Sequence, residues 1–191
     1  MLTIAWDVDD VLNELMREWL RQEWLPGHPA CALTYEHLAE NPPHRLLGAS
    51  WEEYARSLDR FRNSSSARSL APSPDVLSWL TSHGGNFRHL ALTGRPLHTV
   101  PVLAEWVFFH YGKWIRTFSY VPSRDDVEMP VYDRSKRDYL QWLGRADVLV
   151  DDNRENIEAA ISLGIKGVLI PRPWNGCGGG TPEALRRIRE T

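Results

Sequence analysis

Two groups of acidic residues lie close enough together along the chain to do chemistry. Asp7, Asp9 and Asp10 follow an apolar stretch near the N-terminus, and Asp151 and Asp152 follow another. In an extended chain Asp7 and Asp9 point to the same side. Carboxylates that share a cleft repel one another, which raises their pKa values or requires a cation, and oxygen ligands of this kind suit Mg²⁺. Either group taken alone is equally well explained as a solvated turn or a helix N-cap.

The elements that would position these residues alternate between strands and helices. Short apolar stretches predict five strands, at residues 2–6, 89–93, 115–121, 147–151 and 167–170. Amphipathic or capped segments predict helices from Val11 to Pro26 and at about 74–83, 100–111, 135–142, 153–163 and 182–189. Strands joined by helices of this length predict a parallel sheet with right-handed crossovers. The expected fold class is α/β, a Rossmann-like doubly wound sheet.

In such sheets ligands bind beyond the carboxyl ends of the strands, near the point where the strand order reverses. Three of the five predicted strands end in polar groups suited to chemistry. Asp7 with Asp9 ends one strand, and Asp151 with Asp152 ends another. Between them in sequence, the segment 93–95 (Thr-Gly-Arg) ends a third strand. We therefore expect these residues to gather in one cleft.

The stretch from residue 12 to 73 interrupts this alternation. It is rich in proline and polar residues, with short helical patterns near residues 35–39 and 51–58. We interpret it as a small helical insertion that packs over a core formed by residues 1–11 and 74–191. Aromatic side chains in it would either stack on a flat ligand or fill a core, namely Trp19, Trp24, Tyr35, Trp51 and Tyr54.

Composition limits the classes of function. The 191 residues include 22 Lys and Arg and 25 Asp and Glu, which gives a net charge of −3. This balance does not indicate binding to a nucleic acid polymer or to an anionic membrane. No apolar run approaches the roughly 20 residues that span a bilayer. Cys31 and Cys177 form no metal-binding pair, so a reducing, cytoplasmic location is expected. The oligomeric state is left open.

Four segments, taken in order, resemble the four motifs of the haloacid dehalogenase (HAD) superfamily. They are Asp-Val-Asp-Asp-Val at 7–11, Leu-Thr-Gly-Arg-Pro at 92–96, Lys136, and Asp-Asp-Asn at 151–153. The matching positions span nearly the whole chain. The resemblance implies an HAD-type core in which the insertion at 12–73 is a C1-type cap. It also implies Mg²⁺ as the cofactor.

By this resemblance, Asp7 would be the nucleophile that attacks a phosphoryl group and forms an aspartyl-phosphate. Asp7, the main-chain carbonyl of Asp9 and Asp152 would bind Mg²⁺, with Asp151 in support. The direct role could also fall to Asp151 instead of Asp152. Asp9 would act as general acid and base, and its presence favours phosphate chemistry over dehalogenation, because halide-displacing members lack this second aspartate.

The same resemblance assigns phosphate binding to the Thr93 hydroxyl and the Gly94 amide. Lys136 would stabilise the nucleophile and the transition state, with Lys113 or Arg137 as possible substitutes. Asp151 would orient Lys136. Arg95 has a planar fork suited to a second anionic group on the substrate, although it would serve equally well in an ion pair with a carboxylate.

Within the superfamily the chain looks most similar to the 5'(3')-deoxyribonucleotidase-like group. The compact insertion, the segment 148–157 and Pro-Arg-Pro-Trp-Asn at 171–175 carry this similarity. Two features depart from the group. Asp10 occupies a position that is commonly glycine, and Thr-Gly-Arg-Pro at 93–96 replaces a Thr-Ser-Pro type of motif.

The expected function is a Mg²⁺-dependent phosphomonoesterase that acts on a small phosphorylated metabolite, possibly a 5'-nucleotide. Two alternatives stay open. The same aspartyl-phosphate would serve a phosphotransferase or mutase, if the phosphoryl group passes to another hydroxyl. A non-catalytic module that binds a phosphorylated ligand would use a similar sheet edge, but it would not need the Asp7 and Asp9 pair.

Overall fold

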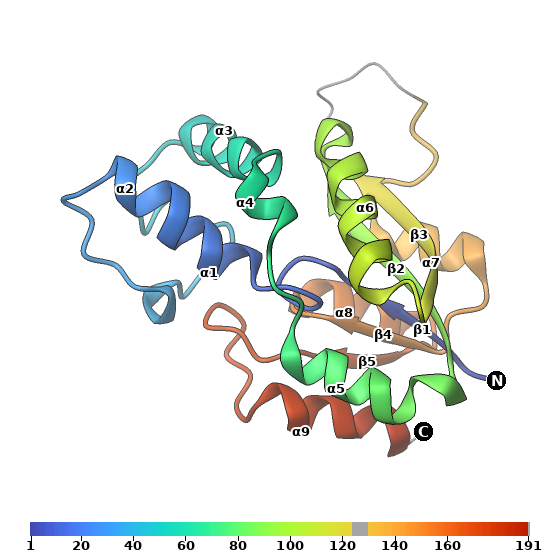
Figure 1. The fold of residues 1–191 in the computed structure, drawn as a ribbon. Helices are drawn as coiled ribbons and strands as arrows, with labels where there is room; N and C mark the ends of the chain where they lie inside the picture. Colours follow the sequence, from blue (N-terminus) through green and yellow to red (C-terminus); the bar gives the residue numbers. More distant parts are fainter. Residues whose placement is uncertain (124–129, 191) are drawn as a thin grey trace.

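The computed structural model describes residues 1–123 and 130–190 and contains a five-stranded sheet (Figure 1). The strands are β1 (Thr3–Trp6), β2 (Arg88–Arg95), β3 (Ile115–Pro122), β4 (Val148–Asp151) and β5 (Lys166–Leu169). Their spatial order is β3-β2-β1-β4-β5, and all neighbours are parallel. The predicted doubly wound α/β fold is confirmed, with each strand within two residues of its predicted bounds.

Helices cover both faces of the sheet because successive side chains of a buried strand point to opposite sides. Ile4 and Trp6 belong to one hydrophobic cluster, whereas Ala5 belongs to the other. The first cluster includes side chains of α5 (Pro74–His83), α6 (Val100–Tyr111) and α9 (Thr181–Arg186). The second includes side chains of α7 (Lys136–Leu143) and α8 (Arg154–Ser162). Short 3₁₀ turns complete these layers, at η3 (Gly84–Asn86), η4 (Leu97–Thr99) and η5 (Arg187–Glu190).

The strand order reverses between β1 and β4. From β1 the chain runs outward through β2 to β3, and then returns to the other side of β1 to form β4 and β5. Trp6 pairs with Val150, and the Asp7 amide donates a hydrogen bond to the Val150 carbonyl at 2.8 Å. The residues that end β1 and β4 are therefore neighbours at the carboxyl edge, where sheets of this type bind ligands.

The first helix is shorter than predicted. Instead of starting at Val11, it begins with α1 (Leu15–Trp19) and continues as a π-helical turn, η1 (Leu20–Trp24), and α2 (Leu25–Gly27). The preceding residues form a turn because Asp10 has a φ of 59°. The Asn13 side chain closes this turn by accepting hydrogen bonds from the amides of Asp10 and Leu15. Side-chain acceptors of this kind compete with helical hydrogen bonding.

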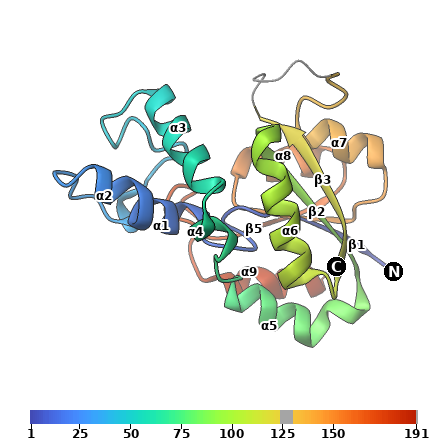
Figure 2. The ribbon, with the colours of Figure 1, turned by 45° about the horizontal axis from the view of Figure 1, so that its top comes forward.

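The rest of the segment before α5 is η2 (Tyr35–His37), α3 (Trp51–Arg62) and α4 (Ser65–Arg68). Ser50 and Ser64 cap α3 and α4 by accepting hydrogen bonds from backbone amides of the first turn. Figures 1 and 2 both show α1 to α4 grouped beside the carboxyl edge of the sheet. The two ends of the segment meet, since the Ser73 amide donates to the Leu12 carbonyl at 2.7 Å.

Most aromatic side chains of this segment are structural. Trp19 and Trp24 are fully buried in the hydrophobic cluster, and their rings pack 5.4 Å apart. Tyr35 is also buried, whereas Trp51 is 43% exposed. Only Tyr54, among the five aromatic residues considered for ligand stacking, lines the cavity described below. Among the described helices, none is long and apolar enough to cross a bilayer.

Candidate active site

An ammonium group and two carboxylates form a buried ion triad between β1 and β4. The Lys136 Nζ lies 2.8 Å from Asp7 Oδ1 and 2.7 Å from Asp151 Oδ2. All three side chains are buried. Burial would lower the pKa of Lys136, but the charges of Asp151 and Asp7 outweigh it and raise this pKa above its ordinary value. Lys136 therefore stays charged and fixes the position of the Asp7 carboxylate.

The start of α7 explains why Lys136 reaches this triad. Ser135 caps the helix by accepting a hydrogen bond from the Asp138 amide at 3.2 Å, which fixes the first turn beside the sheet edge. The two other basic residues considered for this role lie elsewhere. Arg137 is exposed, and the Lys113 ammonium lies over the Trp114 ring at 5.1 Å. Of the three candidates, Lys136 contacts Asp7.

Asp151 and Asp152 have different surroundings. Asp151 accepts hydrogen bonds from the Asn153 amide at 2.8 Å and from the Asn156 side chain, besides the ion pair with Lys136. Its oxygens are therefore fully engaged. Asp152 accepts one hydrogen bond through Oδ2, and within the described chain its Oδ1 accepts none. This difference favours Asp152 as a direct cation ligand and Asp151 as the residue that orients Lys136.

A loop after β5 holds Asp152 in place. The Trp174 indole Nε1 donates to Asp152 Oδ2 at 2.8 Å, and the Asn175 side chain donates to the Asp152 carbonyl at 2.8 Å. Trp174 also contacts the segment 12–73, because its ring and the Tyr35 ring meet edge to face with their centroids 5.9 Å apart. Arg172 Nε from the same loop donates to the Asp10 carbonyl at 2.7 Å. The loop thus joins three parts of the site.

The donor set fits a hard divalent cation. One oxygen from each of Asp7, Asp151 and Asp152 can be chosen so that all three lie within 4.8 Å of one another. Burial, together with the charges of Asp151 and Asp10, raises the pKa of Asp152 to about 8. Burial also raises the pKa of Asp7, with contributions from Asp151 and Asp152. A cation would relieve this repulsion, and three carboxylates match Mg²⁺ chemistry.

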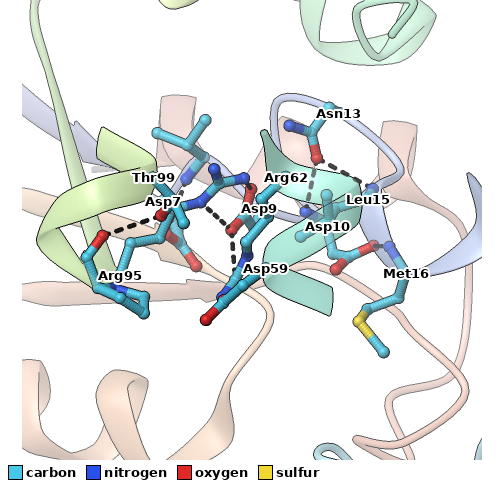
Figure 3. Close-up of polar contacts among 12 residues, drawn as sticks. Asp7, Asp9, Asp10, Asn13, Leu15, Met16, Asp59, Arg62, Arg95 and Thr99 are labelled. Atoms are coloured by element: carbon cyan, nitrogen blue, oxygen red, sulfur yellow. Dashed lines mark hydrogen bonds and ion pairs between the residues drawn. The ribbon is translucent and has the colours of Figure 1, made fainter. Parts of the chain in front are cut away.

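Asp9 does not belong to this group of close carboxylates and binds arginine instead. Arg95 forms a two-bond ion pair with it, from Nε to Oδ2 at 2.7 Å and from Nη2 to Oδ1 at 2.5 Å (Figure 3). Arg62 Nη2 lies 3.5 Å from the same Oδ2. Burial would raise the pKa of Asp9, but the two arginines lower it below its ordinary value. The guanidinium of Arg95, which we expected to bind a substrate anion or a carboxylate, is occupied by Asp9. A metal contact through the Asp9 carbonyl stays a prediction.

Asp10 joins β1 to the segment 12–73. Its φ of 59° lies in the left-handed region, which favours glycine over other residues. The carboxylate accepts a hydrogen bond from the Met16 amide at 3.0 Å and thereby caps the start of α1 (Figure 3). Burial raises the pKa of Asp10 to about 7, against the opposing charge of Arg172.

These residues line a cavity of about 180 Å³. Thr93 and Gly94 form part of its wall at the end of β2, beside Asp7 and Lys136. A Cβ atom built on Gly94 meets no atom within 4 Å, so the space above this backbone is open to a ligand. The segment 12–73 supplies the facing wall with Leu15, Met16, Asn41, Tyr54, Leu58 and Arg62. The cavity can hold a small ligand between the carboxylates and this wall.

Sequence reasoning missed several residues of the site, among them Arg62 and Trp174. Arg62 comes from α3, which is distant in sequence from every motif. The only signal was the spacing of four residues from Tyr54 to Leu58 and from Leu58 to Arg62, which places the three on one helix face. Trp174 belongs to the segment 171–175, which the similarity singled out without a role. The contacts of Arg62 with Asp9 and of Trp174 with Asp152 could not be predicted from the sequence, because the fold brings these residues together.

No protein-family model matches this sequence, and no curated protein matches it. Solved structures do. A haloacid dehalogenase-like hydrolase from Streptococcus pneumoniae superposes with a TM-score of 0.60 at 12% identity, covering 98% of this chain and 90% of that one. A hydrolase from S. pneumoniae TIGR4 superposes with a TM-score of 0.61 at 12% identity, covering 99% and 98%.

A further similar structure contains a metal. The HAD-type hydrolase YfnB from Bacillus subtilis, solved with bound magnesium, superposes with a TM-score of 0.56 at 12% identity, covering 99% of this chain and 97% of that one. At these identities the likeness shows the fold alone. The chain therefore has an HAD-like fold over nearly its full length.

Proposed function

We propose that this protein is a Mg²⁺-dependent phosphomonoesterase of HAD type, a hydrolase acting through an aspartyl-phosphate. The triad of Asp7, Lys136 and Asp151, with Asp152 beside it, is the observation that carries the proposal. It supports the proposal because the Asp7 carboxylate and the Lys136 ammonium line the same cavity as the open backbone at Gly94, so that Asp7 could act as the nucleophile. The HAD-like fold supports the same chemistry by analogy.

In the proposed reaction, an Asp7 oxygen attacks the phosphorus, and the bond to the leaving oxygen breaks. Lys136 favours the ionised form of Asp7 and holds it in place, while the Thr93 hydroxyl and the Gly94 amide would donate to phosphate oxygens. Asp7 and Asp152 would hold Mg²⁺, with Asp151 beside them, and the ion would supply positive charge against the phosphate when bound. Water then attacks the phosphorus, and the acyl-phosphate bond to Asp7 breaks.

Asp9 would take the proton from this water and give it to the next leaving oxygen. Its pairing with Arg95 and Arg62 lowers its pKa and keeps it ionised, which is the form that the first of these steps needs. The second step needs a protonated Asp9, which the arginines disfavour. We therefore expect esters with good leaving groups, which require little protonation, to react fastest.

The segment 12–73 would act as a cap that selects a small substrate. Its wall closes a cavity of about 180 Å³, below the roughly 300 Å³ at which ordinary ligand pockets begin. This size fits a phosphate ester of a few carbons. A 5'-nucleotide would enter only if the cap moved away from the sheet edge.

The proposal is tested by assaying p-nitrophenyl phosphate, small alkyl phosphates and nucleoside monophosphates with Mg²⁺ and with EDTA. We expect Mg²⁺-dependent release of phosphate and a loss of at least about 10³-fold in kcat for Asp7→Asn, because the nucleophile is removed. Asp75→Asn, an exposed residue at the start of α5, is the matched control and should keep full activity.

Unchanged turnover in Asp7→Asn would refute the mechanism. Formation of a new phosphate ester when an alcohol is added would identify a phosphotransferase instead. Binding of phosphate esters with no release of product under any condition would favour a non-catalytic module.

A further inference from the structure

Arg62 is the basic side chain that the cap contributes to the cavity wall. It lies on α3 at a spacing of four residues from Leu58, which itself follows Tyr54 by four, so the three side chains form one stripe along the helix. All three line the cavity. The Arg62 side chain is only 13% exposed, and a guanidinium so deeply placed beside an enzyme cavity needs hydrogen-bond acceptors.

The contacts of Arg62 leave part of this need unmet. Its Nη2 lies 3.5 Å from Asp9 and its Nη1 lies 3.4 Å from Asp59, both longer than usual charged hydrogen bonds (Figure 3). Arg95 already binds both oxygens of Asp9 at shorter distances. The Arg62 Nε is buried and makes no hydrogen bond with any described residue. Arg62 therefore has unused donors.

Its position indicates which part of a substrate would meet it. The proposed phosphate subsite lies at Asp7, Lys136 and Gly94. Arg62 instead contacts Asp9, the residue proposed to exchange a proton with the leaving oxygen. A substrate group next to Arg62 would thus belong to the leaving group, on the far side of the ester oxygen from the phosphorus.

We propose that Arg62 binds a carboxylate on the leaving group, so that the substrate class is a small phosphorylated carboxylic acid. This inference rests on the proposed function. A guanidinium fork matches a carboxylate with two parallel hydrogen bonds. Leu15 and Met16 on the same wall would contact the intervening carbons, and the cavity of about 180 Å³ limits their number. The anion-binding role considered for Arg95 thereby passes to Arg62, because Asp9 occupies Arg95.

The experiment compares 2-phosphoglycolate, which carries a carboxylate, with propyl phosphate, which is similar in size and lacks it. Wild type, Arg62→Gln and Arg62→Lys are assayed, with Arg60→Gln as the matched control on the same helix; Arg60 is exposed and pairs with Glu23. We expect wild type to favour phosphoglycolate in kcat/KM, and Arg62→Gln to reduce this preference about tenfold to hundredfold. Arg62→Lys should recover part of it, and Arg60→Gln should keep it.

A binding measurement separates recognition from turnover. In the Asp7→Asn background, calorimetric Kd values for the two esters should differ in the same direction, and adding Arg62→Gln should remove the difference. Equal losses for both esters in Arg62→Gln, or no wild-type preference while p-nitrophenyl phosphate is hydrolysed, would overturn this inference alone. Failure to hydrolyse any ester would overturn the proposed function and this inference with it.

Discussion

The two sides of the cavity differ in their charged contacts. We call the side with Asp7, Lys136 and Asp152 the floor, and the side formed by the segment 12–73 the roof. At the floor, the charged groups make short, buried contacts, such as those of Lys136 with Asp7 and Asp151. At the roof, Arg62 makes only long contacts, and further ion pairs of the cap, such as Arg60 with Glu23, are largely solvent-exposed. Buried networks fix a geometry, whereas exposed ion pairs contribute little to stability.

This difference separates two tasks. The proposed transfer of a phosphoryl group to Asp7 would require fixed positions, and neighbouring strand ends of the parallel sheet could supply them. Selection of a substrate would require contacts that can adapt, and Arg62 on α3 has hydrogen-bond donors that no described residue uses. Substitutions at the floor should therefore affect the free energy of unfolding and the turnover together, while substitutions at the roof should affect the preference among substrates.

The largest expected effect is that of Lys136→Met. Removing the ammonium leaves Asp7 and Asp151 buried without their partner, so the free energy of unfolding should fall by about 3–5 kcal/mol. Urea unfolding measures this loss. Arg137→Met, at the exposed neighbouring position, is the control and should change stability by less than about 0.5 kcal/mol. Similar effects of the two substitutions would show that the floor is not a fixed network.

The pH dependence of the metal-free protein should be the next largest effect. The pKa of Asp152 is raised to about 8, well above its value in the unfolded chain. Between about pH 4 and 8 the folded state therefore binds a proton that the unfolded state has released, so stability falls as pH rises. We expect a decrease on the order of a few kcal/mol from pH 5.5 to 8 in EDTA.

Mg²⁺ should oppose this decrease, since it favours the ionised carboxylates. The gain in Tm on adding Mg²⁺ should be larger at pH 8 than at pH 5.5. A metal-free protein whose stability rises over this range would contradict the description of Asp152.

Trp174→Phe should have the smallest of these effects, and it tests the loop that joins floor and roof. The substitution keeps a ring against Tyr35 but removes the hydrogen bond to Asp152. Loss of a partner behind a metal ligand commonly weakens affinity about tenfold or more. Calorimetric titration with Mg²⁺ measures it, and Trp142→Phe, at an exposed position, is the control. Unchanged affinity would mean that Trp174 does not position Asp152.

The sequence predicts the floor better than the roof. Buried parallel strands are continuous apolar runs, so their ends at Asp7, Thr93 and Asp151 can be located directly. Once the sheet is parallel, these ends must share one edge. The cap gives no such rule, because its short helices are arranged by contacts between distant residues.

The start of α1 illustrates what local patterns omit. Apolar residues recur at helical spacing from Val11, yet the Asn13 side chain and the left-handed Asp10 form a turn there. Arg95 shows the same limit for the site. Its position after Thr93 favours a ligand contact, but its actual partner, Asp9, comes from another strand end. Such pairings emerge only from the assembled structure.

The hydrogen bond from Ser73 to Leu12 closes the cap into a loop whose entry and exit touch. Because the chain enters and leaves this insertion at one junction, replacing residues 12–73 by a short linker would not require any strand to change its neighbours. If the insertion selects the substrate as proposed, its exchange for that of another protein of this fold should change the substrate preference.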